Sequence, residues 1–217
     1  MNYIENIFVC LAAPLLIALI CTQGKGKRMM FFLLSGMAAC LLSSYISTFI
    51  AAAQGVELLT ASLEISPLVE ETMKLFPILF YLLIFEPHKR DIADSCLMTA
   101  IGFATFENVC YLLQNGADRI LYLLIRGFGT GAMHVVCAFI MAAGILRLWD
   151  RVWLRAAGTL ALLAVAITYH GVYNILVSQT GTLALIGYLI PLFTTVITLI
   201  FRKAVFGKDV VKEKAPF

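Results

Sequence analysis

Four short groups of polar residues interrupt apolar stretches of this sequence, and their residue types suit hydrolytic chemistry. In the first group, Lys74 follows Glu71 by three positions and Glu70 by four, so on a helix it can reach either carboxylate. The other groups are Glu107 with Tyr111, Arg126 with His134, and His170 with Asn174. Carboxylates and imidazoles are the usual proton-transfer groups of enzymes, so the pattern predicts general acid–base chemistry.

The residues around these groups indicate a membrane protein. Of the 217 residues, 61% are hydrophobic and 13% are charged, whereas a soluble domain has about 25% charged residues. A soluble fold of this size would leave much of that apolar surface in water. The net charge of +3 is small and the basic residues are dispersed, so we expect no nucleic-acid partner. The sequence predicts an all-α, multi-pass protein of the cell membrane, surrounded by the lipid bilayer.

A membrane-spanning helix needs about 20 mostly apolar residues. About seven such segments can be drawn, at residues 3–22, 29–53, 64–85, 93–115, 119–146, 156–178 and 182–206. The connections between them are short. We therefore expect a single membrane-embedded domain, residues 1–217, with the polar groups in its 64–178 part.

The basic residues predict the orientation of these segments. Thirteen of the sixteen lie on alternate connections and at the C-terminal end, including Lys208, Lys212 and Lys214, whereas the opposite connections hold only Arg119. Cytoplasmic connections are enriched in lysine and arginine. We therefore expect the N-terminus outside and the C-terminus in the cytoplasm.

Five charged residues remain inside the predicted spans, namely Glu70, Glu71, Lys74, Glu107 and Arg126. Each costs about 2.5–3.5 kcal/mol at the centre of a span, so five unpaired charges would cost roughly 12–18 kcal/mol. That exceeds a typical folding stability of about 5–15 kcal/mol. The charges must therefore pair or line a water-filled cavity. They sum to −1, so either one carboxyl keeps its proton or a histidine is cationic.

The depths of the polar residues predict that they converge. Glu71, Glu107 and His170 each lie about 7–9 residues from the outer end of their span, which is roughly 10–14 Å at 1.5 Å per residue. Arg126 lies at a similar depth and His134 lies deeper. Ionisable residues inside a membrane mark a functional site by default. We therefore expect one site in the outer half of the bundle.

These residues resemble the PrsW family of membrane-embedded glutamic-type proteases, which is related to the type II CAAX prenyl proteases. The resemblance covers roughly residues 64–178 and rests on four motifs, which are EExxK at Glu70–Lys74, FENVCY at Phe106–Tyr111, Arg126 with His134, and HxxxN at His170–Asn174. The CAAX branch has EExxxR and FxxxH at the first two places, and this chain has neither. Either His134 or Glu107 takes the part of the missing histidine.

The resemblance implies an intramembrane peptidase that makes the first, outer-side cut in a single-pass anti-sigma factor, after which a second protease releases the sigma factor. For peptide hydrolysis we expect Glu70 or Glu71 to activate water without a cofactor. His170 and Asn174 would then hold the oxyanion or the scissile carbonyl, and His134 would contact the water or the leaving group. Lys74, Glu107, Tyr111 and Arg126 would support them.

Other functions remain open on the sequence alone. Carboxylates with two histidines could hold zinc, although the sequence has no HExxH motif. Buried Glu and His residues also serve proton-coupled transporters, although no inverted repeat is visible. A non-catalytic scaffold for other membrane helices, and a Cys137/His134 nucleophile pair, are the remaining alternatives.

Overall fold

The computed structural model describes residues 4–85, 87–116 and 120–206, and this part of the chain contains helices and no strand. Its helices are α1 (Ile4–Cys21), α2 (Gly24–Gln54), α3 (Leu58–Glu64), α4 (Ser66–Phe85), α5 (Lys89–Asn115), α6 (Ile120–Leu148), α7 (Val152–Val177), α8 (Thr182–Ile200) and α9 (Arg202–Phe206). The predicted all-α, multi-pass membrane architecture is confirmed.

Six of the described helices are long and apolar enough to cross a membrane, namely α1, α2, α5, α6, α7 and α8. The predicted span at 64–85 is the helix α4, but Glu70, Glu71 and Lys74 lower its hydropathy. Its 20 residues are nevertheless about as many as a membrane crossing needs. The predicted span at 182–206 is divided into α8 and the short α9.

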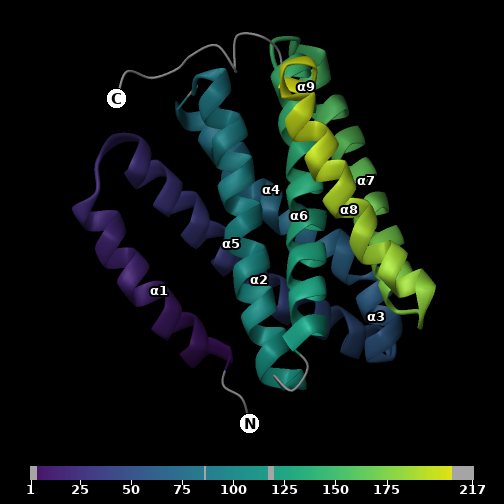
Figure 1. Ribbon diagram of the computed structural model, residues 1–217. Helices are drawn as coiled ribbons and strands as arrows, with labels where there is room; N and C mark the ends of the chain where they lie inside the picture. The colour runs from purple at the N-terminus through teal and green to yellow at the C-terminus, as the bar shows by residue number, and fades with distance from the viewer. Residues whose placement is uncertain (1–3, 86, 117–119, 207–217) are drawn as a thin grey trace.

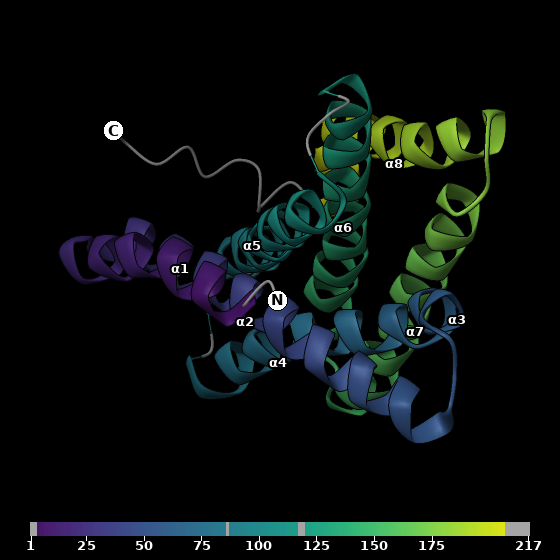
Figure 2. The same ribbon diagram turned by 90° about the horizontal axis from the view of Figure 1, so that it is seen from below.

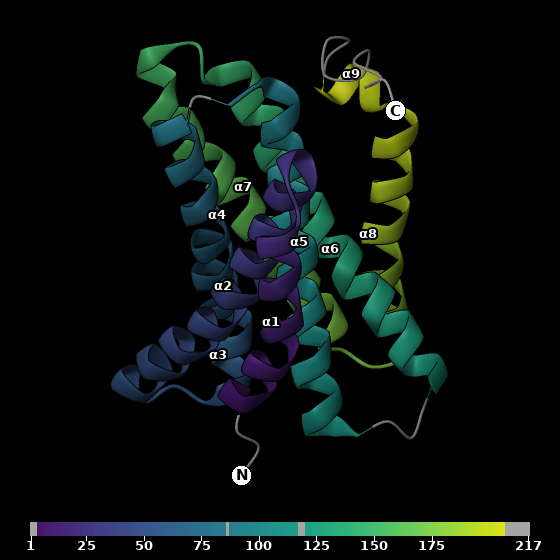
Figure 3. The same cartoon turned by 90° about the vertical axis from the view of Figure 1, so that its left-hand side faces the viewer.

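The helix α6 is the centre of the bundle and packs against α5, α7 and α8 (Figures 1 and 2). Of the candidate spans it has the largest buried share, whereas α1 lies at the edge against α2. In Figure 3, α6 runs obliquely past the more upright α5. A central, tilted helix contacts neighbours on several sides, so its residues can meet side chains from different helices.

Two glycines allow α2 and α5 to pack closely. A methyl group on Gly36 would collide with the carbonyl oxygen of Thr99, and one on Gly102 would collide with the carbonyl oxygen of Leu33. Small residues permit such close backbone contact between membrane helices. The contact fixes α5, and with it Glu107, against α2.

The described basic residues of the α1–α2, α4–α5 and α6–α7 connections lie at the end of the bundle that holds α9, opposite α3 (Figure 1). Two ion pairs join α2 and α5 there, Arg28–Asp91 at 2.5 Å and Lys25–Asp94 at 2.8 Å. Arg119, Lys208, Lys212 and Lys214, which entered the orientation argument, lie outside the described residues. The direction in which the bundle crosses the membrane stays a prediction.

Candidate active site

All nine residues singled out in the sequence come together around one place near the α3 end of the bundle. They are Glu70, Glu71 and Lys74 from α4, Glu107 and Tyr111 from α5, Arg126 and His134 from α6, and His170 and Asn174 from α7. Pro67 lies in the first turn of α4, where a missing N–H costs no intrahelical hydrogen bond. This start places the two adjacent glutamates about one turn into the helix.

The Glu71 carboxylate is enclosed by hydrogen-bond donors. Its Oε1 accepts from Lys74 Nζ at 2.6 Å and from His170 Nδ1 at 2.7 Å. The Glu71 side chain is only 3% exposed. Because one oxygen already accepts two close donors, the carboxylate is held in place and its charge is balanced within the protein.

Lys74 also fixes the tautomer of His134. The ammonium group donates to His134 Nδ1 at 2.9 Å, so this nitrogen is the acceptor. His134 Nε2 then bears the proton and donates to Glu107 Oε2 at 2.6 Å. A continuous chain of hydrogen bonds therefore runs from α7 through Glu71, Lys74 and His134 to α5.

Arg126 contacts this chain of hydrogen bonds at its Glu107 end. Its Nη2 lies 3.3 Å from Glu107 Oε1, and its Nη1 donates to Asn108 Oδ1 at 2.5 Å. The guanidinium carbon lies 3.6 Å from the centre of the Tyr111 ring, a stacked cation–π contact. Arg126 therefore pairs with Glu107, and the Tyr111 ring packs against the Arg126 guanidinium.

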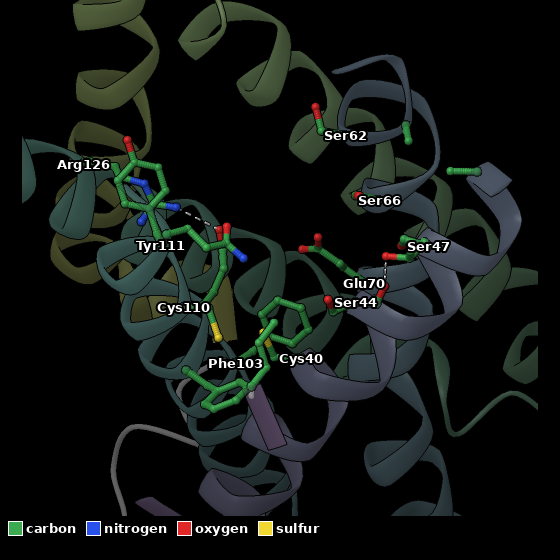
Figure 4. A pocket seen from close by; sticks show the side chains of 17 residues that line it. Cys40, Ser44, Ser47, Ser62, Ser66, Glu70, Phe103, Cys110, Tyr111 and Arg126 are labelled. Atoms are coloured by element: carbon green, nitrogen blue, oxygen red, sulfur yellow. Dashed lines mark hydrogen bonds and ion pairs between the residues drawn. The ribbon is translucent and has the colours of Figure 1, made fainter. Parts of the chain in front are cut away.

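Glu70 differs from the other two carboxylates. Among the described residues its carboxylate has one polar contact, with His170 Nε2 at 3.7 Å, and no hydrogen bond. Its side chain is 18% exposed and points into a hollow between α2 and the Tyr111–Arg126 pair (Figure 4). Since His170 Nδ1 donates to Glu71, the neutral His170 ring presents an acceptor at Nε2 towards Glu70.

Two contacts near the site were not anticipated from the sequence. The Asn174 amide nitrogen donates to the carbonyl oxygen of Ser62 at 2.9 Å, which ties α7 to the short helix α3. Tyr173 immediately precedes Asn174 in the chain, and its hydroxyl lies 2.7 Å from the Thr130 hydroxyl. Tyr173 precedes Asn174 in the sequence, and Asn108, the partner of Arg126, follows Glu107. These neighbouring positions were the sequence signal from which both residues could have been added to the site.

Three residues could offer metal ligands. One ligand atom from each of Glu70, His134 and His170 lies within 4.8 Å of the other two. A carboxylate with two imidazoles is a donor set of catalytic zinc sites, and the Glu71–His170 hydrogen bond is the usual support of a zinc-bound histidine. The ligand types of these three residues therefore suit zinc. However, both ring nitrogens of His134 already have hydrogen-bond partners, Lys74 at Nδ1 and Glu107 at Nε2, and a metal ion would replace one of these contacts.

Comparison with known proteins gives one family. The model of a family described as PrsW family intramembrane metalloprotease matches residues 25–201, which contain all nine candidate residues. No curated protein and no solved structure matches this chain.

Proposed function

Because this chain belongs to the PrsW family of intramembrane metalloproteases, it is a membrane-embedded peptide hydrolase, and we propose that Glu70 activates the water that cleaves its substrate. The resemblance noted in the sequence is thereby confirmed at the level of the family. We also propose a substrate class and the side of the membrane on which the cut occurs.

The observation that supports Glu70 as the base is the difference between the two adjacent glutamates. Glu71 accepts hydrogen bonds from Lys74 and His170 at Oε1, and its side chain is only 3% exposed, so it is held inside the cluster. Glu70 faces the hollow and has His170 Nε2 at 3.7 Å as its polar contact, a separation that one water molecule can bridge. A general base needs access to the water that it deprotonates, and of these two residues Glu70 has it.

In the proposed step, a water molecule held between Glu70 and His170 loses a proton to the Glu70 carboxylate as its oxygen bonds to the scissile carbonyl carbon. The C–N bond then breaks, and Glu70 returns the proton to the leaving nitrogen. Asn174 and Arg126 both line a neighbouring hollow between α6 and α7, which Glu70 also lines. They are the donors available to a developing oxyanion.

For the substrate we propose a single-pass membrane protein of the anti-sigma-factor type, cut first on the outer side. Two features support this. The hollow adjoins Glu70 near the α3 end of the bundle, and the described basic connections lie at the opposite end. Since basic connections face the cytoplasm, the α3 end would face outward.

The test is co-expression with a candidate single-pass anti-sigma factor, with cleavage followed by immunoblotting. We expect Glu70→Gln to abolish cleavage, because it removes the base and changes little else. The double variant Glu70→Ala/Glu71→Ala should also be inactive. Glu64→Gln, at an exposed position on α3, is the matched control and should cleave normally. Normal cleavage by Glu70→Gln would refute the assignment.

Zinc is the second candidate, favoured by the Glu70, His134 and His170 group and by the family description. These three residues would hold the ion, and it would supply an activated water at neutral pH. We place the metal-free mechanism first because Lys74 occupies the acceptor nitrogen of His134. Metal analysis of purified active protein distinguishes the two.

A further inference from the structure

Two hollows adjoin each other at Glu70. The first, about 290 Å³, is bounded mainly by α2, α3 and α5. The second, about 300 Å³, is bounded mainly by α6 and α7. Six residues line both: Ser62, Ser66, Glu70, Glu107, Tyr111 and Arg126. A chain lying from one hollow to the other would therefore pass directly over the Glu70 carboxylate.

The wall on the α2 side consists of small residues. Those of α2 that line the first hollow are Cys40, Ser44, Ser47, Thr48 and Ala51, which share one face of the helix. Such a face usually receives another membrane helix, but here it borders open space, as the labelled Cys40, Ser44 and Ser47 show in Figure 4. Within the described part of the chain, the buried Ser47 hydroxyl has no hydrogen-bond partner.

The wall of the second hollow is aromatic. Tyr111, Tyr122, Tyr173 and Tyr188 line it. The hydroxyl oxygens of Tyr111 and Tyr122 are 3.2 Å apart, and those of Tyr122 and Tyr188 are 3.4 Å apart. Tyrosine combines a large apolar surface with a hydrogen-bonding tip. This half of the site therefore offers aromatic contact to a large side chain and hydroxyl groups to a peptide backbone.

We propose that the two hollows form one groove, which holds an unwound segment of a membrane-spanning substrate across Glu70, with a small residue on the α2 side and a larger residue on the tyrosine side. This inference rests on the proposed function. Unwound backbone inside a membrane must find hydrogen-bond partners. The serine and threonine hydroxyls of one half and the tyrosine hydroxyls of the other supply them.

The experiment uses purified full-length protein and a set of single-pass reporter proteins. The outer half of the reporter's membrane segment is made of alanine, and phenylalanine then replaces one alanine at a time. Cleavage products are identified by mass spectrometry, which gives the cut position for each reporter. We expect phenylalanine to be tolerated on one side of the scissile bond and to block cleavage on the other.

A variant that fills the hollow beside α2 tests whether the small residues of α2 cause the block by phenylalanine. Ser44 is exposed to the hollow, so Ser44→Phe should fold while it occupies the space. We expect it to slow cleavage of the alanine reporter by about tenfold or more, the factor that corresponds to about 1.4 kcal/mol. Thr48→Phe, one turn along the same face, is a second such variant. Leu42→Phe, exposed on α2 but outside the hollow, is the matched control and should cleave normally.

The outcomes separate the two levels of the proposal. If Ser44→Phe and Thr48→Phe cleave at the wild-type rate, or if phenylalanine is tolerated equally on both sides, the groove is wrong while the peptidase proposal stands. If the wild type cleaves no reporter, or no better than Glu70→Ala/Glu71→Ala, the proposed function fails and the groove fails with it.

Discussion

Lys74 offers the sharpest test of how the charged cluster is held together. It is buried, donates to Glu71 at 2.6 Å and to His134 at 2.9 Å, and lies 4.9 Å from the centre of the Phe103 ring. Lys74→Met retains most of the side-chain volume but leaves Glu71 as a buried carboxylate without its cation. Removing one partner of a buried ion pair costs about 3–5 kcal/mol.

The magnitude can be checked with a double-mutant cycle. Glu71→Gln alone leaves the buried Lys74 ammonium without its carboxylate, and it should also lower the free energy of unfolding by about 3–5 kcal/mol. The double variant Lys74→Met/Glu71→Gln contains no buried charge at this pair, so we expect only the cost of imperfect hydrogen bonds, about 1–3 kcal/mol. The two single costs should therefore exceed the double cost by about 3 kcal/mol or more.

The assay is reversible unfolding in mixed detergent micelles, followed by circular dichroism. Expression level and extraction as a monodisperse species serve as the folding control for each variant. If the single-variant costs simply add up in the double variant, Lys74 and Glu71 do not interact as the geometry indicates. The explanation of how α4 tolerates its charges would then be wrong.

Three further results are expected. Gly102→Ala should lower the thermal unfolding midpoint, because overpacking costs about 1–3 kcal/mol, whereas Gly131→Ala, where an added methyl group meets nothing within 4 Å, should not; equal midpoints would contradict the close α2–α5 contact. Arg126→Lys should reduce the cleavage rate by about tenfold, because lysine retains the charge but cannot reproduce the planar contacts with Asn108 and Tyr111; unchanged kinetics would remove Arg126 from the site. Chelation should leave activity intact, whereas loss of activity that added zinc restores, with one zinc per chain by mass spectrometry, would favour the zinc-dependent mechanism.

The sequence predicted the membrane class, the positions of the long helices and the set of residues that meet. These features follow from local composition, because a run of apolar residues of membrane length has few alternatives to a helix. Charged residues inside such runs must then find one another. Two of these charges, Arg126 and Glu107, lie 3.3 Å apart.

Which partner each residue takes could not be read from spacing. Lys74 can reach Glu70 or Glu71 from its own helix, and the choice depends on His134 and His170, which arrive from α6 and α7. His134 was expected deeper than Glu107, yet the two are hydrogen bonded. The rotation and tilt of each helix about its neighbours decide such contacts, and those are properties of the whole bundle.

The placement of the α4 charges has a consequence for how this protein is made. In the order of synthesis α4 precedes α6 and α7, and its charged residues oppose insertion into a membrane. Lys74 and Glu71 lie three positions apart on that same helix, so they can neutralise each other without waiting for another segment. Glu70 gains its polar contact only after α7 has been made, because that contact is His170. The site around Glu70, the base that we propose, is therefore completed only after α7 has been made, late in the synthesis of the chain.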